Sequence, residues 1–92
     1  MDPLEARRRR ALYRAMHRGT KEMDWLLGRY AMAQLPAMSE AELAEVERLI
    51  ALADPDLQSW ILEGGPRADS GLDALVDRIR RFHGLGTETA HT

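Results

Sequence analysis

The 92-residue chain contains no cysteine, which excludes a disulfide framework, a thiolate metal site and a cysteine nucleophile. It also lacks a long hydrophobic run, because its longest uninterrupted apolar stretch, residues 49–53, is far shorter than the roughly 20 residues of a membrane span. Residues 7–10 are all arginine, but no apolar segment follows them as it would in a secretory signal. We therefore expect a cytoplasmic protein without membrane insertion.

No stretch alternates between polar and apolar residues with a period of two, so the sequence predicts no β-strand. Caps, prolines and glycines instead divide the chain into five helical segments. The predicted segments cover about residues 3–17, 20–35, 39–53, a short stretch from 54 to the break at 64, and a last one from 70 to Gly84. The expected fold is all-α, a compact five-helix bundle forming one domain over 1–84, with 85–92 as a flexible C-terminal tail.

Each predicted helix begins with a recognisable signal. The proposed caps are Asp2 before Pro3, Thr20, the Ser39–Glu42 capping box, Asp54 before Pro55, and Ser70 with Asp73. Gly19 stands where the first helix would end in a left-handed turn, a conformation that glycine adopts without a Cβ penalty. The segment 17–20 is therefore predicted to be the turn between the first two helices.

Apolar residues at helical spacing predict the core. The candidates are Leu4, Leu12, Ala15, Met16, Met23, Leu26, Leu27, Tyr30, Gln34, Leu43, Val46, Leu49, Ile50, Ala53, Leu57, Trp60, Ile61, Leu72, Leu75, Val76, Ile79 and Phe82. They form one face of each predicted helix, as a bundle requires.

The second predicted helix carries an unusual stripe opposite its core face. Lys21, Trp25, Gly28, Arg29 and Met32 follow one another at spacings of three and four. A glycine inside a helix costs about 1 kcal/mol relative to alanine, so Gly28 is expected to allow a close approach. Two explanations remain open: a partner's backbone packs between the tryptophan and the methionine, or the C-terminal helix of the same chain covers the stripe.

The sequence gives little support for an active site. It contains no His-Glu-x-x-His spacing, and no glycine-rich phosphate loop follows a strand. Glu22 and Asp24 differ by two positions, which places them about 200° apart around a helix, so they do not form a carboxylate pair on one face. We predict that the protein is not an enzyme and binds no metal.

The charge is unevenly distributed along the chain, although the net charge is only −2. Residues 1–30 hold eight Lys and Arg against four acids, whereas residues 31–66 hold one against seven. The basic N-terminal half keeps an alternative open, a small helical nucleic-acid-binding or antitoxin-like regulatory module. Phosphates would, however, be repelled by Glu22 and Asp24 at the start of the second helix, where a helix-turn-helix protein reads bases.

The turn and the start of the second helix are better suited to binding a protein. Arg18 offers a planar fork of donors, and Gly19 lets a partner's main chain come close. Glu22 and Asp24 lie in the first helical turn, where the helix dipole favours carboxylates. Trp25 would add an aromatic anchor. If Arg18 and Glu22 merely paired with each other, that exposed contact would be worth only about 0–1 kcal/mol.

These residues resemble a known family. Arg18-Gly19-Thr20-Lys21-Glu22-Met23-Asp24 looks like the Arg-Gly-x-x-Glu-x-Asp signature of the succinate dehydrogenase assembly factors of SdhE type, the flavinylation factors. Residues 26–31 resemble the apolar continuation of that helix, and residues 54–61 resemble the family's Asp-x-Asp-Leu-x-x-Trp segment. The resemblance covers roughly residues 7–83. His17 departs from it, because many bacterial members have a second arginine at this position.

The resemblance implies a five-helix protein without enzymatic activity. Such factors bind the flavoprotein subunit of succinate dehydrogenase or fumarate reductase and promote covalent attachment of FAD to a histidine of that subunit. FAD would then be the client's cofactor, and no cofactor is expected to bind this chain stably. The resemblance places Arg18, Gly19 and Glu22 in the functional signature, with Asp24 as an adjunct. Trp25 and Arg29 join the expected partner-binding set because of the helix face they share.

Overall fold

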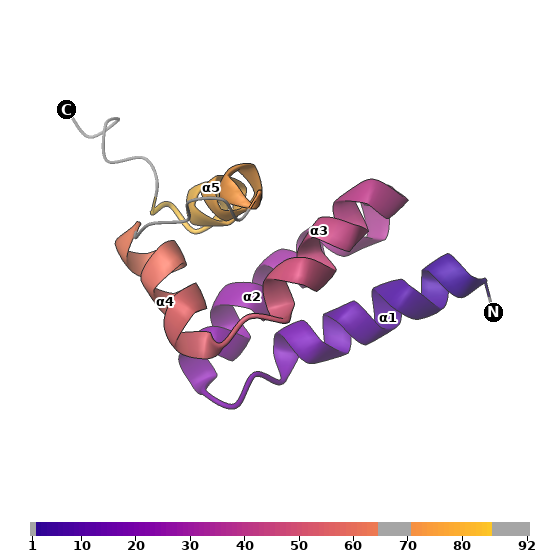
Figure 1. Ribbon diagram of the computed structural model, residues 1–92. Coiled ribbons are helices and arrows are strands. Elements are labelled where there is room, and N and C mark those ends of the chain that lie inside the picture. The colour runs from indigo at the N-terminus through magenta and orange to yellow at the C-terminus, as the bar shows by residue number, and fades with distance from the viewer. Residues whose placement is uncertain (1, 65–70, 86–92) are drawn as a thin grey trace.

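The described part of the chain, residues 2–64 and 71–85 of a computed structural model, is built from helices and contains no strand (Figure 1). The elements are α1 (Pro3–Met16), α2 (Lys21–Gln34), the 3-10 helix η1 (Leu35–Ala37), α3 (Glu40–Ile50), α4 (Asp54–Glu63) and α5 (Asp73–Phe82). The all-α fold with five α-helices is therefore confirmed within these ranges. None of the helices described is both long enough and apolar enough to cross a membrane.

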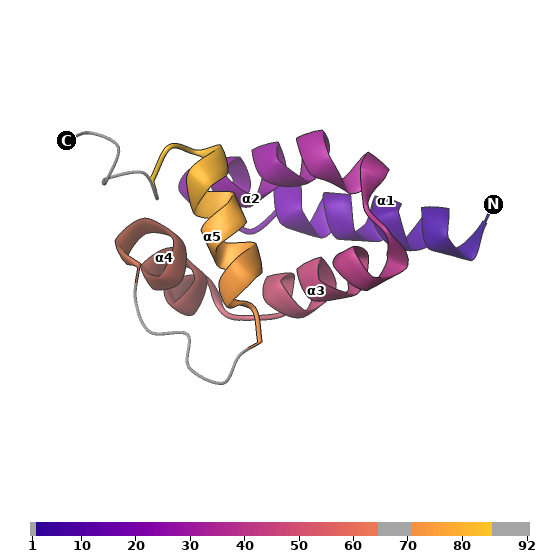
Figure 2. The same ribbon diagram turned by 90° about the horizontal axis from the view of Figure 1, so that it is seen from above.

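The five helices form two groups that share one core. α1, α2 and α3 lie lengthwise beside one another, and α4 and α5 pack at the end of this group where α1 turns into α2 (Figure 1). Seen from above, α5 crosses the direction of the first three helices (Figure 2). As a result, the α1–α2 turn, the start of α4 and the end of α5 are all at the same end of the molecule.

Two of the predicted helix starts have the expected cap geometry. The Thr20 hydroxyl accepts a hydrogen bond from the Met23 amide at 3.2 Å and begins α2. At the start of α3 the Ser39 hydroxyl accepts from the Glu42 amide at 3.2 Å, while the Glu42 carboxylate accepts from the Ser39 amide at 2.8 Å. Both arrangements satisfy amides that have no partner inside the helix.

Three other starts differ from the prediction. Asp2 stands at the cap position of α1, but its side chain makes no capping hydrogen bond. The cap position of α4 is Ala53, so Asp54 is the first residue inside the helix and its carboxylate is free to act elsewhere. α5 begins at Asp73 after Leu72, and the proposed cap Ser70 lies outside the described residues.

The core contains most of the residues that helical spacing selected. The buried apolar side chains are Ala11, Ala15, Met23, Leu26, Leu27, Tyr30, Ala31, Leu35, Met38, Leu43, Val46, Leu49, Ile50, Leu57, Ile61, Leu72, Leu75, Val76 and Ile79. Leu4, Leu12 and Trp60 pack against this core while only partly buried. The α-helices thus meet around one continuous hydrophobic cluster.

Three core predictions were wrong, two of them at the last residue of a helix and one in the connection between α3 and α4. Gln34 is exposed at the last residue of α2, and Ala53 is exposed because α3 already ends at Ile50. Phe82, the last residue of α5, is 42% exposed and meets Tyr30 edge-on with ring centroids 5.5 Å apart. A periodic pattern does not show where a helix leaves the core, because that depends on the neighbouring helices.

The predicted tail begins with a residue that is held in place. Leu85 packs against the core, and its carbonyl accepts a hydrogen bond from Arg80 at 3.2 Å. Residues 86–92, the rest of the predicted flexible tail, lie outside the described residues. The proposed boundary at residue 84 therefore stays a prediction.

Candidate protein-binding edge

The turn between α1 and α2 is held by the first turn of the helix that follows it. Gly19 has φ +118°, a conformation that side-chain-bearing residues rarely adopt. Asp24 reaches back from α2, and its Oδ1 accepts from the Gly19 amide at 3.3 Å and from the Arg18 amide. The Asp24 amide in turn donates to the Thr20 carbonyl at 2.9 Å. Asp24 therefore faces its own turn and fixes the shape of that turn.

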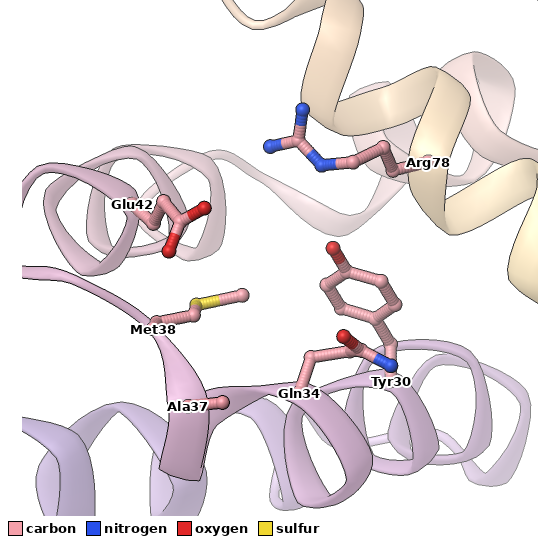
Figure 3. A pocket seen from close by; sticks show the side chains of 6 residues that line it. All are labelled: Tyr30, Gln34, Ala37, Met38, Glu42 and Arg78. Atoms are coloured by element: carbon pink, nitrogen blue, oxygen red, sulfur yellow. The ribbon is translucent and has the colours of Figure 1, made fainter.

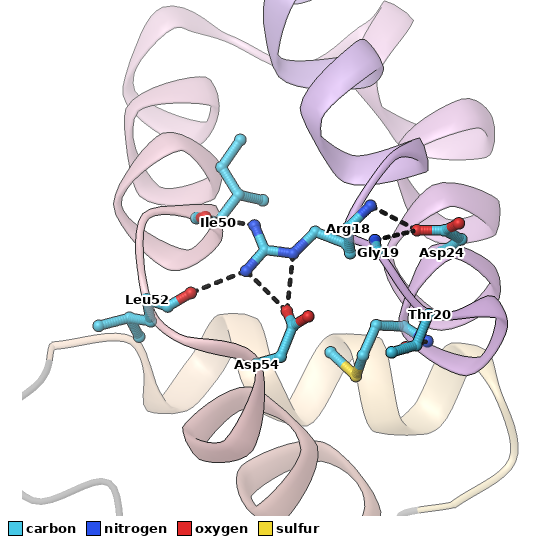
Figure 4. A network of polar contacts seen from close by, with 8 residues as sticks. Arg18, Gly19, Thr20, Asp24, Ile50, Leu52 and Asp54 are labelled. Atoms are coloured by element: carbon cyan, nitrogen blue, oxygen red, sulfur yellow. Dashed lines mark hydrogen bonds and ion pairs between the residues drawn. The ribbon is translucent and has the colours of Figure 1, made fainter.

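The side chain of Arg18 points away from the turn toward the junction between α3 and α4 (Figure 4). Its Nε donates to Asp54 Oδ1 at 2.9 Å and its Nη2 to the Leu52 carbonyl at 2.7 Å, while Nη1 donates to the Ile50 carbonyl. Only 11% of the side chain is exposed. We call these contacts the Arg18 network. The planar fork expected at this position exists, but it is bound to the protein's own chain.

Glu22 pairs with a residue of α4 and not with Arg18. Its Oε1 accepts a hydrogen bond from Gln58 Nε2 of α4 at 3.1 Å, at an exposed position. This bond brings together the two segments that carry the family resemblance, residues 18–24 and 54–61. The start of α2 and the start of α4 therefore form one surface rather than two separate sites.

The stripe on α2 has two different neighbours within the chain. A Cβ added at Gly28 would lie 3.1 Å from Met16 Cγ and 3.4 Å from Met16 Cα, so the close approach that this glycine permits is that of α1. Trp25 is tilted against the ring of His83, with centroids 4.5 Å apart, yet remains 50% exposed. Met32 is 52% exposed. Gly28 therefore permits the packing of α1 and not the approach of a partner's backbone. The other explanation, that the C-terminal helix covers the stripe, is correct only for Trp25, and only in part.

Arg29 lies next to Trp25 on the exposed side of α2. Among the described residues, no carboxylate lies within ion-pair distance of its guanidinium. Trp25, Arg29, Phe82 and His83 together line a surface pocket of about 320 Å³, which we call the aromatic pocket. We use the name recognition edge for Gly19, Glu22, Trp25 and Arg29, the exposed members of the predicted site.

Several N-terminal arginines are engaged within the chain. Arg7 bonds to Glu47 at 2.7 Å and to Glu40 at 3.0 Å, and Arg8 donates to the Met38 carbonyl at 2.8 Å. The hydrogen bond from Arg7 lowers the pKa of Glu47 below its ordinary value. These two cations join α1 to other elements of the fold, as Arg18 joins the α1–α2 turn to the α3–α4 junction. A nucleic-acid site would lose them as phosphate contacts.

A second pocket lies where the end of α2 and η1 meets α3 and α5 (Figure 3). Both of its charged side chains already have partners: Glu42 belongs to the capping box, and the guanidinium of Arg78 lies 3.3 Å from the Glu45 carboxylate. The hydrogen bond to the Tyr30 hydroxyl is the largest cause that raises the pKa of Arg78. No group of three or more potential metal ligands occurs among residues 2–64 and 71–85. The recognition edge remains the better candidate site.

Two residues at this end of the molecule have roles that the sequence did not indicate. Asp54 was assigned to a helix cap, although it supplies the carboxylate of the Arg18 network. His83 received no role, although its Nε2 lies 2.8 Å from the Leu26 carbonyl and its ring covers part of Trp25. Both are distant in sequence from the segment 17–25, and no local pattern links them to it.

The chain is similar to one described protein family and to several known proteins. The family described as flavinator of succinate dehydrogenase matches residues 9–83. The FAD assembly factor SdhE of Acetobacter pasteurianus is 43% identical over 78 residues, which cover 85% of this chain and 72% of that protein. The mitochondrial succinate dehydrogenase assembly factor 2 of Dictyostelium discoideum is 35% identical over 60 residues, covering 65% of this chain and 43% of that protein.

The chain thus spans less than half of the Dictyostelium relative and most of the Acetobacter one. No solved structure matches the chain significantly.

Proposed function

The chain belongs to the family of flavinators of succinate dehydrogenase, and on this premise we propose that it promotes covalent attachment of FAD to the flavoprotein subunit of succinate dehydrogenase or of fumarate reductase. It would do so as an assembly factor that binds this subunit through the recognition edge, and it would act in the cytoplasm. Neither nucleic acid nor a membrane is a partner in this proposal.

One observation carries the proposal. The family match runs from residue 9 to residue 83 and so includes both segments that meet at the recognition edge. The relative that is 43% identical is itself named an FAD assembly factor. No observation favours the nucleic-acid alternative, since Arg7, Arg8 and Arg18 bond within the chain.

In this mechanism the small protein supplies a surface and the client supplies the chemistry. FAD would belong to the client, and a histidine of the client would supply the side chain to which the flavin becomes bonded. A factor that binds one client conformation more tightly than the others raises its population, and with it the fraction of time that histidine and flavin are aligned. The Arg18 network and Asp24 fix the turn in advance, so that little conformational entropy is lost when the edge binds.

The proposal is tested by producing the cognate flavoprotein subunit with and without this chain. Covalent flavin is read as fluorescence of the subunit band on a denaturing gel, and total FAD is measured separately in the native protein. We expect covalent FAD to rise several-fold in the presence of the chain, while non-covalent FAD is available in both cases. Equal covalent flavin in the two preparations would overturn the proposal.

A binding measurement tests separately whether the chain binds the flavoprotein subunit and whether it binds nucleic acid. Purified chain and the flavin-free subunit are expected to form a one-to-one complex in solution. The same chain should show no saturable binding to duplex DNA at moderate salt, where a nucleic-acid protein would show a steep salt dependence.

A further inference from the structure

The aromatic pocket adjoins the turn that carries the family signature. Trp25 comes one helical turn after Glu22, and Arg29 one turn after Trp25. Phe82 and His83 complete the pocket from the end of α5. The pocket therefore joins the signature surface on α2 to an element that is distant in sequence.

The walls of this pocket are ordered before any partner arrives. His83 is held from two sides, by the contact of its Nε2 with the Leu26 carbonyl at 2.8 Å and by its ring contact with Trp25. Phe82 lies edge-on to His83 with centroids 5.0 Å apart. Such a fixed aromatic surface loses little side-chain entropy on binding.

The pocket combines apolar rings with a cation. Trp25 is 50% and Phe82 42% exposed, and Arg29 forms no ion pair with a carboxylate among the described residues. Exposed Trp and Arg are the side chains most enriched where protein interfaces gain their affinity. The occupant that complements them has a carboxylate for the guanidinium and an apolar side chain for the rings.

We propose that the aromatic pocket receives an acidic segment of the client flavoprotein, in which an Asp or Glu side chain lies beside an apolar one. This inference rests on the proposed function and specifies the chemistry of its interface. A protein segment suits the pocket better than a small molecule, because small-molecule sites enclose most of their ligand whereas two walls of this pocket remain about half exposed. The carboxylate pairs with Arg29, and the apolar side chain packs against Trp25 and Phe82.

The first test measures the dissociation constant of the complex with the purified flavoprotein subunit. Trp25→Ala is expected to weaken binding about 30-fold, the size of an interface anchor. Arg29→Glu should weaken it more than tenfold, because it places a carboxylate against a carboxylate. Arg10→Glu is the matched control: it makes the same charge change on α1, at a residue that lines none of the pockets named above, and should leave binding within about twofold. Circular dichroism verifies the fold of each variant.

The second test identifies the group that Arg29 meets. In the Arg29→Lys variant, a carbodiimide joins the introduced amine directly to a carboxylate in contact with it, and mass spectrometry locates the bond. We expect a link from position 29 to an Asp or Glu of the client, next to an apolar residue. The Arg10→Lys variant should give no link of this kind. A position 29 that forms no link to a client carboxylate, in a variant that still binds the subunit, would overturn the inference.

The outcomes separate this inference from the proposed function. If the wild-type chain does not bind the subunit, the proposed function fails. If it binds, and Trp25→Ala and Arg29→Glu bind equally well, only the acidic-segment inference is overturned. Quenching of Trp25 fluorescence by free FAD at micromolar concentration would assign the pocket to a cofactor, and a self-association lost in Trp25→Ala would assign it to a second copy. Either result also overturns the inference.

Discussion

Arg18 and Arg29 are the same residue type, but they are used in opposite ways. Arg18 lies in the α1–α2 turn, four residues before Glu22, and Arg29 lies on α2, seven residues after it. The guanidinium of Arg18 is bonded to Asp54 and to two backbone carbonyls, and its side chain is 11% exposed. Arg29 is exposed beside Trp25, without a carboxylate partner in the described chain. Arg18, the arginine of the family signature, thus stabilises the fold around the turn, a role that we call the frame. Arg29, outside the signature, is available to a partner.

This difference changes the interpretation of the signature. Arg18 joins the α1–α2 turn to the α3–α4 junction, and Asp24 holds the same turn from the other side. Gly19 lies between them with open space around its Cα, since a Cβ built there meets nothing within 4 Å. We therefore propose that Arg18 and Asp24 contribute to binding by positioning Gly19 and Glu22, which face the partner.

The largest effect on stability is expected from Arg18→Met. Removing the guanidinium leaves the Asp54 carboxylate and two carbonyls without their donors, which should lower the free energy of unfolding by about 2–4 kcal/mol. Arg29→Met is the matched control and should change it by less than about 0.5 kcal/mol. Urea unfolding followed by circular dichroism measures both. Equal values for the two variants would remove the distinction between frame and edge.

Two substitutions at Gly19 distinguish the effect of backbone strain from the effect of blocking the partner. Gly19→Ala and Gly19→Arg both force a side-chain-bearing residue to φ +118°, so each should cost about 1–2 kcal/mol of unfolding free energy. Only arginine adds bulk to the open space where the partner approaches. We expect Gly19→Arg to abolish covalent flavinylation of the client while Gly19→Ala retains much of it. Should the two variants lose flavinylation to the same extent, the shape of the turn and not its accessibility would be the requirement.

Trp25 should matter less for stability than for binding. Half of its side chain is buried, in part against His83, so Trp25→Ala is expected to cost about 1 kcal/mol of unfolding free energy. Met32→Ala, at almost the same exposure but without a ring contact among those described, should cost less. Thermal unfolding compares the two. A loss above about 3 kcal/mol in Trp25→Ala would show that the tryptophan belongs to the core.

The ion pair between Arg7 and Glu47 is expected to have the smallest effect on stability, and that effect should depend on pH. The hydrogen bond from Arg7 lowers the pKa of Glu47 below the ordinary value of 4.5, so the stabilisation is fully present above that pH and is lost as the pH falls through the lower value in the folded protein. The difference in melting temperature between the wild type and Glu47→Gln should therefore shrink from about pH 7 to about pH 3. Glu63→Gln, at the exposed end of α4, is the control for the loss of one carboxylate. A constant difference for Glu47→Gln would mean that the pair with Arg7 is not formed.

Much of the fold follows from local rules. Thr20 and the Ser39–Glu42 capping box begin helices where predicted, because a cap needs only residues within three positions of each other. The inward faces of α2, α3 and α5 follow from helical spacing. The errors at Gln34 and Phe82 occur at the last residue of a helix, and the error at Ala53 occurs in the connection after α3. At such positions burial depends on which other helix continues past that point.

The sequence by itself determined the five helices, the glycine turn at Gly19 and the segment that carries the family signature. Only the tertiary structure decided what the polar residues of that segment do: Arg18 bonds to Asp54, 36 positions away, and Trp25 meets His83 across α2 and α5. Helix formation depends on neighbours along the chain, whereas hydrogen bonds and ring contacts between helices depend on how the helices pack. For this reason the sequence could indicate a candidate site, but it could not show that Arg18 bonds within the chain whereas Arg29 stays exposed.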